Sequence, residues 1–153
     1  MAIEAPASKF RKNNIKIYIV ACFIAAAWFF YDGYFNKNFI EKQTDENGKP
    51  NSTLVFNQKS PPFFAAGAVL LGVYLVIINK KKLLADENEL IINNKITIPY
   101  DSIEKINKTY FESKGYFILT FKDNNRKEAD IKISNRKYDG LENILNHLIK
   151  KIS

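Results

Sequence analysis

Residues 17–30 (IYIVACFIAAAWFF) and 63–78 (FFAAGAVLLGVYLVII) decide the fold of this chain. Both stretches are apolar throughout, and lysines border each of them. A bilayer core is about 30 Å thick and takes roughly 17–25 helical residues to cross, because only a helix or a closed barrel satisfies every backbone polar group in hydrocarbon. The two stretches therefore predict a transmembrane hairpin.

The predicted hairpin divides the 153 residues into five segments. We expect a basic head over 1–14, transmembrane helices over 15–35 and 63–79, a polar extracytoplasmic loop over 36–62, and a folded domain over 80–153. Only the last segment is long enough for a globular core. A domain of that length is marginally stable unless the membrane or a second copy supports it.

The formal charge of +7 is concentrated at the predicted helix ends. Residues 1–16 hold four basic residues and one acid, residues 31–62 hold four of each, and residues 80–153 hold 15 basic residues and 11 acids. Short segments rich in Lys and Arg stay in the cytoplasm, so both termini are predicted inside. The residues expected to set this topology and to meet anionic lipid headgroups are Arg11, Lys12, Lys80, Lys81 and Lys82.

A basic start followed by an apolar run is also how a cleaved signal peptide begins. Bulky aromatics at 28–31 disfavour cleavage, whereas Ala25, Ala26 and Ala27 offer the small residues that it needs, so this alternative stays open. A composition rich in Lys, Asn and Ile indicates a bacterial inner (cytoplasmic) membrane. The basic residues form no long run in the tail, which argues against a nucleic-acid partner.

Small residues recur at four-residue spacing on both predicted helices. They are Ala21 and Ala25 on the first helix, and Ala68 and Gly72 on the second. Such pairs let two helix backbones approach closely and pack by van der Waals contact. The contact is either between the two helices of one hairpin or with a second copy.

The polar loop carries strong turn signals around Asn47-Gly48 and Lys49-Pro50. Gly and Pro in such pairs mark chain reversals. We therefore expect a short β-hairpin here, with residues 39–40 and 53–56 as its two flanks.

After Asn79 the apolar pattern changes to period two, which is typical of strands. It predicts strands at 82–85, 90–92, 96–98, 103–110, 116–121 and 129–133. From 141 to 152 the apolar residues return to helical spacing. This predicts an amphipathic C-terminal helix, with Asp139 as its N-cap.

Residues 90–92 (LII), 96–106 (ITIPYDSIEKI) and 115–121 (GYFILTF), followed by one amphipathic helix, resemble the pleckstrin-homology-like (PH-like) domains of bacterial membrane proteins with two N-terminal transmembrane helices. The resemblance covers roughly residues 81–152. It implies an α+β domain, in which the C-terminal helix plugs one open end of a bent antiparallel sheet.

The resemblance also implies a protein that is not an enzyme and needs no cofactor, an accessory or scaffolding subunit that binds other membrane-protein subunits or itself. Two alternatives are a membrane-surface sensor of anionic lipid headgroups and a helper subunit of a redox or transport complex. The single histidine, His147, has no second histidine to join it, and no residue pattern suits catalysis or metal binding. The residues expected to form a rim toward a partner are Lys108, Tyr110, Phe111 and Lys114.

Overall fold

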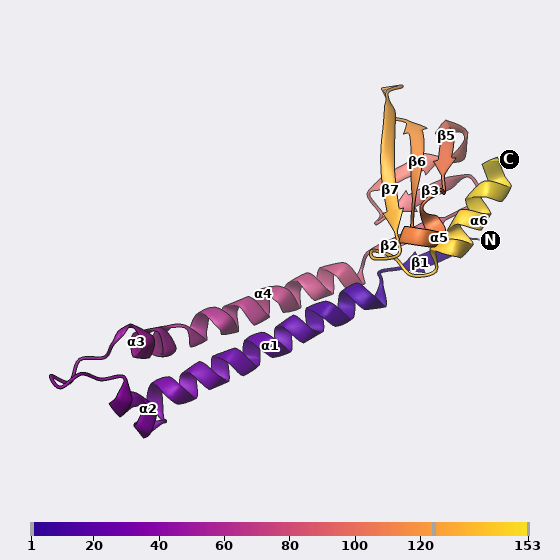
Figure 1. Ribbon diagram of the computed structural model, residues 1–153. Coiled ribbons are helices and arrows are strands. Elements are labelled where there is room, and N and C mark those ends of the chain that lie inside the picture. Colours follow the sequence, from indigo (N-terminus) through magenta and orange to yellow (C-terminus); the bar gives the residue numbers. More distant parts are fainter. Residues whose placement is uncertain (1, 124, 153) are drawn as a thin grey trace. The chain divides into compact units, whose positions relative to one another are not determined.

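The computed structural model describes residues 2–123 and 125–152 of the chain (Figure 1). It divides into two compact units, Met1–Asn13 with Ile77–Ser153, and Asn14–Val76. The first unit is therefore built from both ends of the chain. The second is a continuous stretch inserted between them.

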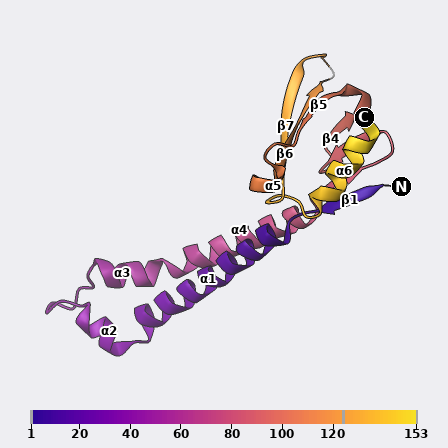
Figure 2. The ribbon, with the colours of Figure 1, turned by 45° about the vertical axis from the view of Figure 1, so that its right-hand side comes forward.

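The inserted unit is helical, with α1 (Lys9–Tyr34) and α4 (Pro61–Asn79) side by side in Figure 1 and in Figure 2. The predicted helices at 15–35 and 63–79 are confirmed, although α1 begins earlier, at Lys9. Lys9–Tyr34 and Ser52–Asn79 are long and apolar enough to cross a membrane, by length and composition. In the most apolar 18-residue stretch of each segment, only 6% and 17%, respectively, is buried. Most of this apolar surface is therefore not covered by the rest of the protein.

The β-hairpin expected in the polar loop is wrong. Its flanks lie instead in two short helices, α2 (Lys37–Lys42) and α3 (Ser52–Lys59), and only a single bridge joins Thr44 to Pro50. Two asparagine caps explain the difference, because a side-chain oxygen that accepts from the first free N–H groups starts a helix. Asn36 accepts from Phe39 N, and Asn51 accepts from Thr53 N and Leu54 N.

The other unit contains two antiparallel sheets and a C-terminal helix, α6 (Leu141–Ile152). The first sheet has the order β1-β2-β3-β4, and the second has the order β5-β6-β7. The strands are β1 (Ile3–Pro6), β2 (Lys82–Ala85), β3 (Glu89–Ile92), β4 (Ile96–Pro99), β5 (Ile103–Asn107), β6 (Tyr116–Lys122) and β7 (Glu128–Ser134), with the 3₁₀ turn η1 (Tyr100–Ser102) and the helix α5 (Phe111–Lys114) between them.

Most of the predicted strands are confirmed, and their turns follow from local chemistry. The connection between β3 and β4 has three residues, 93–95, because Ile92 pairs with Ile96. Asn93 and Asn94 both have positive φ, 54° and 55°, and they occupy the centre of a tight turn that is closed by the hydrogen bond from Lys95 N to Ile92 O. The strand predicted over 103–110 is wrong in its second half, because β5 ends at Asn107. α5 follows it and ends at Gly115, whose φ of 66° suits a helix C-terminus.

β1 is a strand that the sequence did not predict. It pairs with β2 in antiparallel register, Ala5 opposite Leu83, and Ala7 bridges to Tyr138. Asp139 is not the cap of α6, which begins at Leu141; its carboxylate accepts a 2.9 Å hydrogen bond from Lys9 N instead. The helical hairpin is thus inserted between the first two strands of one sheet.

The hydrophobic core lies between the two sheets and α6. The helix places its apolar face inward, as its spacing predicted, with Leu141, Ile144, Leu145 and Leu148 buried. Ala5 of β1 is fully buried in the same core. The other strand residues with no exposed surface are Leu83, Ala85, Leu90, Ile98, Phe117 and Leu119.

Because Ala5 is fully buried, Ala5→Asp should destabilise this unit by about 3–5 kcal/mol, the usual cost of an uncompensated buried charge. The measurement is urea unfolding of the full chain in detergent, followed by circular dichroism and by limited proteolysis of residues 80–153. Glu4→Gln is the control, since Glu4 is exposed and its surface ion pair with Lys82 contributes at most about 1 kcal/mol. An unchanged midpoint for Ala5→Asp would show that β1 is dispensable.

Candidate functional site

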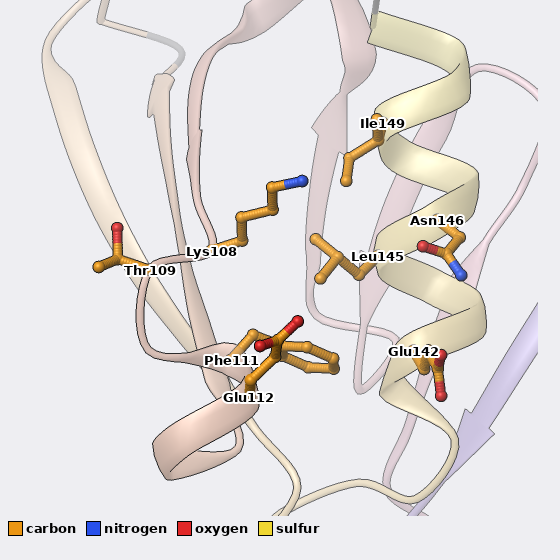
Figure 3. Close-up of a pocket in the computed structure, with 8 residues that line it drawn as sticks. All are labelled: Lys108, Thr109, Phe111, Glu112, Glu142, Leu145, Asn146 and Ile149. Carbon is orange, nitrogen blue, oxygen red and sulfur yellow. The ribbon is translucent and has the colours of Figure 1, made fainter.

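A groove with a volume of about 610 Å³ lies between the β5–α5 connection and α6 (Figure 3). The connection and α5 supply one wall, and the polar edge of α6 supplies the other. The lining residues are Lys108, Thr109, Phe111, Glu112, Glu142, Leu145, Asn146 and Ile149.

The groove has an apolar floor and a charged rim. Phe111 packs edge-on against Phe117, with ring centroids 5.9 Å apart, and this contact fixes the start of α5 against β6. Figure 3 shows Leu145 and Ile149 projecting from α6 toward Lys108 on the opposite wall. The rim carries two carboxylates, Glu112 and Glu142, against the single ammonium group of Lys108. The groove is therefore acidic overall at neutral pH.

Beside the groove, two tyrosines and two lysines form an aromatic-basic ladder. Tyr110 stacks on Tyr116, with ring centroids 5.5 Å apart and planes 28° apart. The Lys114 ammonium lies 4.7 Å from the Tyr110 ring, and the Lys132 ammonium lies 3.6 Å from the Tyr116 ring. A cation over a tyrosine face contributes about 0.5–1 kcal/mol at an exposed site, so the ladder holds the start of α5 against β6 and β7.

The four residues expected to form a partner rim divide between these two features. Lys108 and Phe111 line the groove, whereas Tyr110 and Lys114 belong to the ladder. Sequence reasoning missed Tyr116 and Lys132, because they come from β6 and β7 and only strand register brings them together.

The residues expected to set topology also divide. Arg11 and Lys81 line one cavity of about 190 Å³, and Lys80 lines a neighbouring cavity of about 330 Å³ that also includes Lys81. Lys82 is paired with Glu4, Nζ to Oε2 2.8 Å, and Lys12 is not among the lining residues of either cavity.

The four small residues expected at a helix contact differ in their exposure. Ala68 is buried and Ala25 is half-buried, whereas Ala21 is exposed and a side chain at Gly72 would meet no atom within 4 Å. A close approach occurs instead at Gly33, where a Cβ would lie 3.0 Å from the backbone of Asn57 in α3. Only glycine leaves room for that backbone.

The single histidine has a structural position. His147 Nε2 lies 3.1 Å from the Asp86 carbonyl oxygen, which also accepts a 2.7 Å hydrogen bond from the Tyr100 hydroxyl. These two contacts join α6 and η1 to the turn between β2 and β3. In the ranges 2–123 and 125–152, no group of three or more His, Cys, Asp or Glu side chains is placed to hold a metal ion.

Tyr100 gives the domain an alkaline limit. Burial, followed by the negative charges of Asp86 and Glu89, raises the pKa of Tyr100 to about 12 from its usual value of 10. The neutral phenol therefore stabilises the folded state below about pH 10, and this stabilisation is lost as the pH rises through about 12.

The substitution Tyr100→Phe removes this titrating group. As the pH is raised from 9 to 12, the thermal unfolding temperature of Tyr100→Phe should therefore fall less than that of the wild type. An equal loss in both would contradict this role for Tyr100.

Comparisons of the chain with known protein families, with curated proteins and with solved structures gave no match.

Proposed function

We propose that this chain is a non-enzymatic integral membrane protein, an accessory or scaffolding subunit whose transmembrane hairpin displays a PH-like domain. The observation that carries the proposal is the pairing of β1 with β2 across the inserted helices. The uncovered apolar surface of Lys9–Tyr34 and Ser52–Asn79 requires either lipid or other apolar helices around it.

The strand pairing constrains how the hairpin crosses a membrane. β1 precedes the first apolar helix and β2 follows the second, so the two strands pair only if both lie on the same side. Two crossings satisfy this condition. Removal of α1 as a signal peptide would also remove β1 from the sheet, which favours a retained anchor. The basic residues at both helix ends then favour the cytoplasmic side, and we propose the bacterial inner membrane.

The PH-like assignment is supported by the sheets and by the helix that follows them. Two antiparallel sheets enclose an apolar core, and α6 covers it with Ile144 and Leu148. This is the arrangement expected of a bent sheet whose open end is closed by a C-terminal helix. In this chain the transmembrane hairpin occupies the connection between the first two strands.

The groove beside α6 is the surface that we assign to a partner subunit. Phe111, Leu145 and Ile149 offer an apolar seat, and Glu112 and Glu142 make its rim acidic. The complementary occupant is a segment of another membrane-protein subunit, with an apolar side chain next to a basic one. Charge of opposite sign across such a rim gives specificity and fixes orientation.

The topology is tested by labelling single cysteines in intact cells with a membrane-impermeant maleimide. The native cysteine is replaced first, Cys22→Ser, and Asn47→Cys, Ala2→Cys or Lys127→Cys is then added. Asn47→Cys should react in intact cells, because Asn47 lies in the exposed loop turn. Ala2→Cys and Lys127→Cys should react only after lysis. Labelling of all three in intact cells would exclude the proposed hairpin.

The docking surface is tested with one substitution at two places on α6. Asn146→Arg adds a bulky charge inside the groove, whereas Asn143→Arg adds the same charge outside it. Proteins that copurify with the wild type in mild detergent should be lost, by about tenfold or more, from Asn146→Arg and kept by Asn143→Arg. Equal recovery with both variants would exclude the groove as the docking surface.

A further inference from the structure

Two adjoining cavities lie where the chain leaves β1 and where it enters β2. The smaller, of about 190 Å³, is lined by Ala7, Arg11, Ile78, Lys81, Asn93, Lys137 and Tyr138. The larger, of about 330 Å³, is lined by Ile77, Lys80, Lys81, Asn93 and Lys95. They share Lys81 and Asn93, and all of their residues belong to the unit formed by Met1–Asn13 and Ile77–Ser153.

The charge of these cavities has one sign. Arg11, Lys80, Lys81, Lys95 and Lys137 are all basic, and none of the described residues that line either cavity is acidic. The four lysine ammonium groups around the shared recess repel one another, and an anion that enters it relieves the repulsion. The nearby Glu4 does not serve this purpose, because its carboxylate pairs with Lys82.

The polar groups of the recess are arranged to donate hydrogen bonds. The Tyr138 hydroxyl donates to Asn93 Oδ1 at 3.0 Å, so the amide oxygen of Asn93 is engaged, and the Nδ2 group beside it is a donor. Asn93 itself is held at a positive φ of 54° by the β3–β4 turn, and its N–H donates to Lys82 O at 2.7 Å. Lysine, arginine and amide N–H groups are the donors that phosphate oxygens accept from most strongly.

The recess lies at the ends of the apolar helices along the chain. Ile77 and Ile78 close the apolar run of α4, and Arg11 lies on α1 one turn before Ile15, where the apolar run of that helix begins. In a membrane protein the lipid phosphates lie where the apolar residues end, and basic pockets at that level bind anionic headgroups. The size of the larger cavity falls within the range of ligand sites, about 300–1,000 Å³.

We infer that the two cavities form one binding site for a phosphate group, carried either by the headgroup of an anionic phospholipid or by free phosphate. Lys81 lies at the centre of the site because it lines both cavities. Arg11 and Lys137 bind from one side, and Lys80 and Lys95 bind from the other. The lipid form of this inference rests on the proposed membrane hairpin, whereas the phosphate form does not.

The test uses the purified full chain in a non-ionic detergent with three probes: phosphatidylglycerol, phosphatidylcholine and inorganic phosphate. Dissociation constants are measured for the wild type and for two pairs of substitutions with the same change of charge. Lys81→Gln with Lys137→Gln neutralises the site. Lys105→Gln with Lys127→Gln is the control, because both lysines are exposed and lie outside the two cavities.

The site variant should bind phosphatidylglycerol about 30-fold more weakly than the wild type, and the control should bind within about twofold of it. Phosphatidylcholine should bind weakly to the wild type, to the site variant and to the control variant. Binding of phosphatidylglycerol but not inorganic phosphate identifies a lipid site. Equally tight binding of inorganic phosphate, lost in the same variant, identifies a free-phosphate site.

The inference is overturned if the site variant and the wild type bind both anionic probes equally, or if neither probe binds the wild type. The unliganded site variant should be at least as stable as the wild type, because it loses repulsion between like charges. If it does not fold, Lys80→Gln with Lys95→Gln replaces it, since both of these side chains are exposed and line the larger cavity. Binding of inorganic phosphate does not depend on a bilayer or on the proposed membrane hairpin. A binding site can therefore be shown or excluded by this measurement even if the proposed hairpin is wrong.

Discussion

Pairing of β1 with β2 is the interaction on which the rest of this structure depends. Four residues at the start of the chain complete a sheet whose other strands begin only at Lys82, and Ala5 fills the core that α6 covers. Two further hydrogen bonds join the start of the chain to the segment after β7, from Ser8 N to Lys137 O and from Asp139 N to Pro6 O. The segment before α1 and the segment after α4 are therefore both hydrogen-bonded within the domain.

The same contacts at the start of the chain bring together the residues that line the two basic cavities. Arg11 follows β1, Lys81 precedes β2, and Asn93 comes from the β3–β4 turn, so the pairing of the first sheet brings these three segments together. Lys137 follows β7 and joins them through the Ala7–Tyr138 bridge and the hydrogen bond from Ser8 N to Lys137 O. The groove beside α6 is built by different elements, the β5–α5 connection and the C-terminal helix. One domain thus offers a basic recess at the ends of the apolar helices and a separate, acidic groove suited to a protein segment.

The sequence predicted the elements whose signal is periodic. Long apolar runs predicted the two helices, alternation predicted the strands β3 and β4, and helical spacing predicted α6. It missed β1, because Ile3–Pro6 is short and contains Glu, Ala and Pro, all of them poor strand formers. It also missed the helix caps at Asn36 and Asn51, because turn signals between them favoured a hairpin. It missed the site partners Tyr116 and Lys132, because spacing along a chain does not encode register between strands.

A strand at each end of the hairpin makes folding a check on insertion. β1 is synthesised first and has no partner until β2 emerges, after the whole hairpin has been made. For a hairpin that crosses a membrane twice, correct insertion brings the two strands together and reduces the entropy cost of closing so long a loop. A hairpin that crosses only once leaves β1 and β2 in different compartments, each with an unpaired edge. Such a chain would lack Ala5 in its core and would expose an unpaired strand edge to proteases, so for a hairpin that spans a membrane a complete domain would require the correct topology.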